Sequence, residues 1–309
     1  MTDWLAVSQA HESPQRAVTM QMSRFFTCPG PATFCEANNP DSSTQHSIHT
    51  VSMTHQLKLC LLALGLGVSN ACFAAPEEIQ VYMDEFAEPG KFGLDFHANY
   101  VLQALPGSPT RKMLRVTPEL SYGINQNWEA ALYWLTAAGP EVSAGRPVTD
   151  GTKVRVKWRP RAPSPDSPWY GAINVEVGQL SRRFYPDGAS IETKFIGMYT
   201  QDKWTLAANL NLDRALKRQP LQGATAQIDS KISYRLRPEA EGDWRIGLEN
   251  YAFLGTLRQS AGPSTRTSTT YLATDFSFKR WDFNLGLGKA TGATTDRWLI
   301  KAIIGVPLG

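Results

Sequence analysis

Cysteine is missing from most of this 309-residue chain. The four cysteines all precede Ala75 and are Cys28, Cys35, Cys60 and Cys72. Disulfide bonds and thiolate metal sites are therefore excluded from the C-terminal three-quarters of the sequence. Histidine is nearly absent there too, because only His97 of the five histidines follows Ala75. We expect no metal site and no cofactor in this part of the chain.

The sequence also lacks a strong excess of charge and a long hydrophobic run. Its 31 basic and 28 acidic residues leave a formal net charge of +3, which is no electrostatic basis for a nucleic-acid partner. The longest apolar run, from Leu59 to Val68, is about half the roughly 20 residues that a membrane-spanning helix needs. A spanning helix is therefore not expected.

The short apolar run has the layout of a secretory signal peptide. Lys58 precedes it, and small residues follow it up to Ala74, which predicts a signal peptide over 53–74 with cleavage between Ala74 and Ala75. Two alternatives are a retained membrane anchor and a lipoprotein signal at Cys72. Ser69 does not fit the lipoprotein alternative, because such signals usually carry a leucine-like residue at that position.

The residues before this signal, 1–52, are polar, aperiodic and interrupted by prolines. That composition predicts a disordered segment. We interpret it as an extension upstream of the true start at Met53. A zinc site made by Cys28, Cys35, His46 and His49 is the alternative, but their spacing matches none of the usual zinc patterns.

After the signal, apolar and polar residues alternate with period two, the pattern of β-strands that have two different faces. Phe92, Leu94 and Phe96, for example, alternate with Gly93 and Asp95. Twelve such strands are predicted, over 91–100, 114–122, 128–134, 153–159, 169–177, 192–200, 204–212, 228–236, 244–248, 272–278, 281–287 and 298–308. Nothing helical of useful length separates them.

The predicted connections alternate in length. They are short at 125–127, 201–203 and 279–280 and long at 137–150 and 255–268, and the proline-rich connection 159–167 is an exception on the short side. Short turns at one end and long loops at the other are typical of an up-and-down antiparallel transmembrane β-barrel. We predict an all-β fold of about twelve strands over 90–309, with 75–89 as a periplasmic N-terminal segment.

Large aromatic residues follow the short turns. A tryptophan begins five of the predicted strands: Trp128, Trp169, Trp204, Trp244 and Trp281. Five indoles at one rim indicate a membrane-interface girdle, and we expect Trp134, Trp158 and Trp298 near the opposite rim. A soluble barrel or sandwich is the alternative, but twelve inward apolar faces would enclose a barrel too wide to fill.

Three segments resemble a known group of bacterial proteins. They are "EEIQVYMDEFAEPGKFGLDFHANYVL" from Glu77, "RVTPELSYGINQNWEAALYW" from Arg115 and "KVRVKWRP" from Lys153. They are similar to outer-membrane β-barrel proteins of the phenol-degradation meta-pathway family. The resemblance implies a channel or transporter in the bacterial outer membrane, with aromatic or other hydrophobic compounds as cargo.

Charged residues on the polar strand faces must point into the barrel, because an arginine or lysine facing the middle of the bilayer costs roughly 2–4 kcal/mol. The residues predicted to line the solute path are Asp95, His97, Arg115, Glu119, Glu129, Lys153, Arg155, Lys157 and Arg159. The four bases on 153–159 form either a basic ladder that guides anions or one side of a network of ion pairs. No serine is placed beside His97 to suggest a hydrolase.

Twelve strands predict a narrow lumen. Glycines at inward positions (Gly93, Gly123, Gly247, Gly286 and Gly288) favour an open interior, and the acidic segment 75–89 is expected to fold back against the basic ladder as a plug. The predicted function is a non-enzymatic channel for small solutes. Its alternatives are a closed structural barrel and a barrel-embedded lipid-modifying enzyme. The expected partners are outer-membrane lipid, the barrel assembly machinery and an unidentified small solute.

Overall fold

The computed structural model describes residues 78–164, 166–183, 185–217, 220, 223–237 and 243–308. The predictions made for residues 1–77 lie outside this range. They concern the upstream extension, the signal peptide with its cleavage at Ala74 and Ala75, and the cysteine–histidine zinc alternative.

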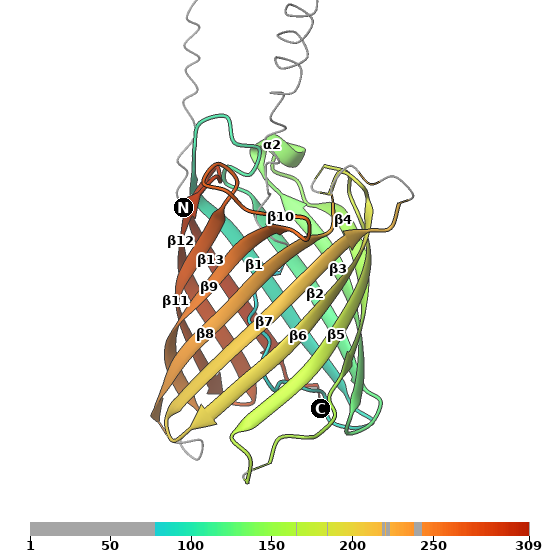
Figure 1. Ribbon diagram of the computed structural model, residues 1–309, viewed down its shortest axis with the longest axis vertical. Helices are drawn as coiled ribbons and strands as arrows, with labels where there is room; N and C mark the ends of the chain where they lie inside the picture. Colours follow the sequence, from blue (N-terminus) through green and yellow to red (C-terminus); the bar gives the residue numbers. More distant parts are fainter. Residues whose placement is uncertain are drawn as a thin grey trace, which may run out of the picture. The chain divides into compact units, whose positions relative to one another are not determined.

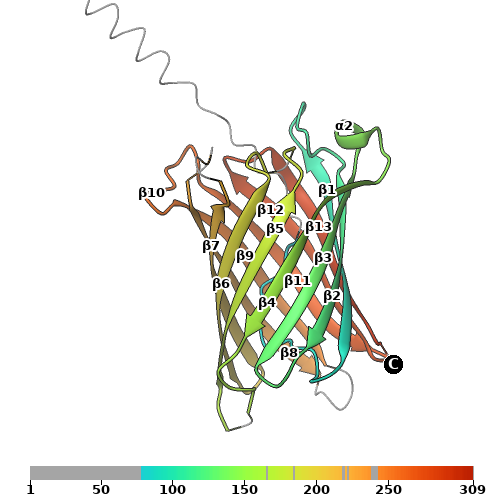
Figure 2. The same ribbon diagram turned by 90° about the vertical axis from the view of Figure 1, so that its right-hand side faces the viewer.

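The described residues form a closed antiparallel β-barrel of twelve strands (Figures 1 and 2). Each strand pairs with its neighbours in the sequence, and β1 closes the ring by pairing with β13. A two-residue strand, β10, only extends the hairpin beyond β9. The barrel strands are β1 (Phe92–Ala104), β2 (Leu114–Gly123), β3 (Trp128–Ala138), β4 (Val148–Trp158), β5 (Trp169–Leu180), β6 (Ala189–Gln201), β7 (Trp204–Ala215), β8 (Thr225–Arg237), β9 (Trp244–Thr256), β11 (Thr267–Phe278), β12 (Trp281–Gly292) and β13 (Asp296–Val306), and β10 is Gln259–Ser260.

The predicted fold class and strand number are confirmed. Several strands are longer than their alternating stretches: β4 begins at Val148 rather than at 153, and β9 continues to Thr256. Backbone hydrogen bonding extends past the positions where the two faces differ in polarity, so periodicity alone underestimates strand length. The one helix in the described part is the four-residue α2 (Pro140–Ser143), and no helix there is long and apolar enough to cross a membrane.

Apolar side chains lie on the outside of the barrel and polar ones on the inside. In β3, Leu132 is 51% exposed whereas the next residue, Tyr133, is fully buried. Charged residues such as Glu119, Arg155 and Lys301 are at most 3% exposed, and exposed Leu, Ile and Val side chains alternate with them on the outer surface. A polar interior inside an apolar wall is the arrangement of a transmembrane barrel.

The two ends of the barrel differ as predicted, with two exceptions. Connections are short at 202–203 and 279–280 and longer at 105–113 and 139–147 on the opposite end. The connection 159–168 is long although it lies at the short-turn end. The connection 293–295 is short although it lies at the long-loop end, where Gly292, with φ 86°, helps the chain reverse tightly.

The outer rim at the short-turn end carries cross-strand aromatic pairs. Trp169 packs on Tyr199 with ring centroids 4.5 Å apart, and Trp204 packs on Tyr234 at 4.8 Å. The five strand-initiating tryptophans are exposed and lie at this end. The prediction for Trp158 was wrong. It ends β4 and faces Trp128 across the ladder at 6.2 Å, because β3 and β4 are antiparallel and the end of β4 therefore lies beside the start of β3.

Candidate functional site

Residues 78–91 run inside the barrel, from the middle of the lumen to the short-turn rim (Figure 1). Tyr82 is the centre of this luminal segment and is 1% exposed. Asn209 of β7 holds its main chain twice: the Tyr82 amide donates to Asn209 Oδ1 at 2.7 Å, and Asn209 Nδ2 donates to the Tyr82 carbonyl at 2.9 Å. The Asn209 side-chain amide thus makes the pair of hydrogen bonds that a neighbouring strand would otherwise make to this main chain.

The end of the luminal segment at the short-turn rim is hydrogen-bonded to the end of β2. Gly90 N donates to Gly123 O at 2.7 Å, and Gly123 N donates to Lys91 O at 3.0 Å. The backbone of Ala87 and Glu88 passes so close to Gly123 that a Cβ there would overlap both carbonyl oxygens. Glycine is required at position 123 by this close approach.

Two lumen lysines bind carbonyl oxygens of the luminal segment. Lys157 Nζ donates to Glu85 O at 2.6 Å, and Lys301 Nζ donates to Ile79 O at 3.2 Å. Arg159 stacks on the Phe86 ring with its guanidinium carbon 3.9 Å from the centroid. The segment therefore meets the basic residues through its main chain and aromatic rings. Ion pairs between its acidic side chains and the basic ladder were expected, but Glu88 pairs instead with Lys91 at the rim.

Arg155 is the centre of the first network of ion pairs. Its NH2 group contacts Glu119 Oε1 at 2.7 Å and also Glu129, while its NH1 group donates to the Tyr133 hydroxyl at 2.7 Å. The Tyr82 hydroxyl lies 3.3 Å from the same NH1 group. The luminal segment therefore shares the guanidinium with strands β2 and β3.

Two further networks cover other parts of the wall. Glu176 binds Lys194 at 2.7 Å and Lys153 at 3.5 Å. Glu249 binds Lys301 and also Lys231, the latter at 3.1 Å. Each of the four bases on 153–159 has an acidic or carbonyl partner, so the ion-pair alternative describes the lumen in this structure.

Burial removes the Tyr82 phenol from water and raises its pKa well above the ordinary value of 10.0. The hydroxyl therefore stays protonated and donates a hydrogen bond to Glu78.

The structure places all nine predicted path residues on the inner side of the wall. His97 contacts Glu119 at 3.0 Å, Arg115 contacts Asp150 at 2.5 Å, and Arg159 donates to Gln126 O at 2.7 Å. Asp95 lies on the same face of β1 as His97 and lines the cavity described below. Four further buried residues of the lumen were not predicted as site members: Asn209, Lys194, Lys301 and Tyr133. The alternation of inward and outward side chains along each strand could have predicted that these four residues point into the lumen.

The inward glycines were interpreted wrongly as a sign of an open interior. Gly123 accommodates the luminal segment, as described above. Gly288 accommodates the ring of Tyr271, and Gly286 lies against the Lys301 side chain and that ring. Gly93 accommodates the Ser121 hydroxyl, and Gly247 lies against the backbone at Ile232. Each of these positions lacks a side chain because a neighbouring group occupies the space.

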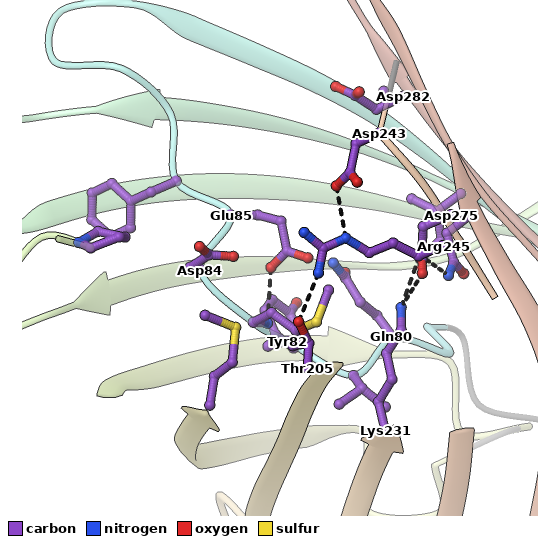
Figure 3. A pocket seen from close by; sticks show the side chains of 18 of the residues that line it. Gln80, Tyr82, Asp84, Glu85, Thr205, Lys231, Asp243, Arg245, Asp275 and Asp282 are labelled. Atoms are coloured by element: carbon purple, nitrogen blue, oxygen red, sulfur yellow. Dashed lines mark hydrogen bonds and ion pairs between the residues drawn. The ribbon is translucent and has the colours of Figure 1, made fainter. Parts of the chain in front are cut away.

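A cavity of about 960 Å³ lies inside the barrel toward the short-turn end (Figure 3). The luminal segment forms part of its lining from Gln80 to Ala87, and the wall supplies charges of both signs. At its mouth, Arg245 contacts Asp243 at 2.7 Å and donates to Thr205 Oγ1 at 2.7 Å, as Figure 3 shows. Lys231 and Asp275, which also line the cavity, pair at 2.8 Å.

The surroundings of His97 contain no nucleophile–base pair in the described residues. Its Nε2 atom faces Glu119, and no serine hydroxyl is bonded to the ring. The polar lumen, the apolar wall and the aromatic rim define a transmembrane β-barrel with a partly occupied interior.

No protein-family model and no curated protein matches the sequence. Among solved structures, the barrel is similar to the KdgM porin in complex with disordered oligogalacturonate, at 10% identity and a TM-score of 0.47, over 70% of this chain and 99% of that one. It is also similar to the NanC porin, at 11% identity and a TM-score of 0.46, over 70% and 99%. LpxR from Salmonella typhimurium gives 8% identity and a TM-score of 0.39, over 70% and 100%.

Proposed function

We propose that this protein is a narrow channel for small solutes in the bacterial outer membrane, with its short turns toward the periplasm. The interior cavity of about 960 Å³ is the observation that carries the proposal, because it combines polar groups with room for a small molecule. Eight-stranded barrels fill their interior with side chains and much larger barrels leave wide pores, so twelve strands suit a restricted path.

The luminal segment acts as the closed gate of this channel. It belongs to no strand of the barrel, and its one ladder contact is the isolated bridge between Pro89 and Gly123. Moving residues 78–88 out of the lumen breaks side-chain contacts at Asn209, Lys157 and Lys301 but no pairing between the barrel strands. The gate can therefore move while the wall stays intact.

The solutes we expect are small and anionic, with aromatic carboxylates as the first class to test. In the closed state Lys157 and Lys301 bind carbonyl oxygens of the gate in addition to the wall carboxylates of Glu129 and Glu249. A solute carboxylate is a stronger partner for an ammonium group than the neutral gate carbonyl that it would replace. The resemblance to the phenol-degradation meta-pathway family points to the same class and stays a prediction.

Solute uptake by liposomes tests this function. Liposomes carrying the barrel should take up benzoate faster than a neutral sugar of similar size, and a Lys157→Gln, Lys301→Gln double variant should lose most of this preference. Uptake of neither solute, by the full chain and by a chain without residues 75–89, would favour the closed structural barrel instead.

A further inference from the structure

Three potential metal ligands meet in the middle of the lumen. They are Glu78 of the luminal segment, His97 of β1 and Glu119 of β2, and each offers one ligand atom within 4.8 Å of the others. His97 and Glu119 are on adjacent strands, but Glu78 reaches them only because the segment folds into the barrel. Nothing in the sequence spacing indicates this juxtaposition.

Each carboxylate has one oxygen held by a residue outside the cluster. Glu119 Oε1 binds Arg155 at 2.7 Å, while Oε2 faces His97 Nε2 at 3.0 Å. Glu78 Oε1 accepts a hydrogen bond from the Tyr82 hydroxyl, and Tyr82 is itself fixed by Asn209. Such outer partners orient the ligands of metal sites and leave the second oxygen for the ion.

His97 supplies an independent indication. Its side chain is 1% exposed, and its Nδ1 atom has no hydrogen-bond partner among the described residues. A buried polar atom without a partner is unusual and destabilising. In metal sites one ring nitrogen of a histidine binds the ion and the other is held by an acceptor or water, and His97 has one nitrogen in contact with Glu119 and the other without a partner among the described residues.

We propose that Glu78, His97 and Glu119 bind one first-row divalent cation, with Zn²⁺ as the ion of best fit. One imidazole and two carboxylates with water as a fourth ligand is a donor set that Zn²⁺ accepts, and Mg²⁺ prefers oxygen donors alone. Ligand bonds of about 2.0–2.2 Å require the three atoms to draw together by roughly 1 Å, which side-chain rotation supplies.

The cation ties the luminal segment to the wall. Glu78 is on the segment and the other two ligands are on strands, so an ion that binds all three stabilises the inserted position over the released one. Metal binding itself does not depend on the proposed channel function. Only its effect on the gate does.

Zinc titration of the full chain, folded in detergent without a histidine tag and stripped with a chelator, tests the site. The expected result is one Zn²⁺ per chain in competition with a chromophoric chelator, and no binding of Mg²⁺ at the same concentration. Glu78→Gln and His97→Gln should each weaken Zn²⁺ binding at least about tenfold. The matched control is Glu88→Gln, which removes an exposed carboxylate from the same segment and should bind as the wild type does.

Absence of stoichiometric Zn²⁺ binding, or unchanged affinity in the Glu78→Gln variant, would overturn the proposal. This variant alters no barrel strand, so its result stands even if the His97 variant fails to fold. The titration needs no bilayer, so a protein that binds Zn²⁺ but takes up no solute would refute the channel and leave the metal site standing.

Discussion

Replacing Arg155 with glutamine should destabilise the barrel by about 3–5 kcal/mol, since removing one member of a buried charge network leaves the others without a partner. The guanidinium lies between Glu119 and Glu129, which are both almost fully buried, and it also donates to Tyr133. Unfolding in denaturant, followed by the loss of the heat-modifiable gel band, measures the change.

Two comparisons make this result specific. Lys91→Gln removes an exposed partner of Glu88 at the rim, and surface pairs of this kind contribute about 1 kcal/mol or less. Adding Glu129→Gln to Arg155→Gln should restore part of the lost stability, because it removes one of the two carboxylates that have lost their arginine partner. Equal stability of the Arg155 and Lys91 variants would show that lumen water screens the network.

Replacing Gly123 with alanine should release the end of the luminal segment that lies at the short-turn rim. The new Cβ would overlap the carbonyl oxygens of Ala87 and Glu88, which cannot move while the segment stays in place. A single thiol placed by Ala87→Cys reports this, because the sequence after Ala75 contains no other cysteine. We expect a bulky maleimide to modify it at least about tenfold faster in the Gly123→Ala background.

Gly171→Ala is the matched control for this labelling experiment. Gly171 lies on β5, where an added Cβ meets only the Ile196 carbonyl at an ordinary 3.6 Å. Labelling in this background should therefore match that of the parent carrying Ala87→Cys alone. Equal rates in all three proteins would mean that the segment is not held at Gly123.

The barrel itself was predictable from the sequence because its signal is local. Period two reveals the two faces of each strand, and the strand-initiating tryptophans mark one rim, so the strand number follows from counting. The error at Trp158 came from placing a residue by type without following the direction of β4. The short connection 293–295 was missed because loop length is not encoded by alternation.

The site was less predictable because its contacts are long-range. The strand register places Arg155 opposite Glu176, yet the guanidinium binds Glu129 on β3 and reaches across that strand to Glu119 on β2. The barrel radius and the side-chain direction determine which carboxylates the guanidinium contacts, and the spacing of residues in the sequence encodes neither. The plug was expected from charge complementarity, but Asn209, Lys157 and Lys301 bind its main chain, whose hydrogen-bonding groups are the same in every sequence.

Single-channel recording in planar bilayers tests most directly whether the luminal segment closes a conducting path. The full chain and a chain lacking residues 75–89 are compared in the same salt. The account predicts a small or intermittent conductance for the full chain and a several-fold larger, steady one for the shortened chain. Equal currents from the two proteins, or no current from either, would contradict it.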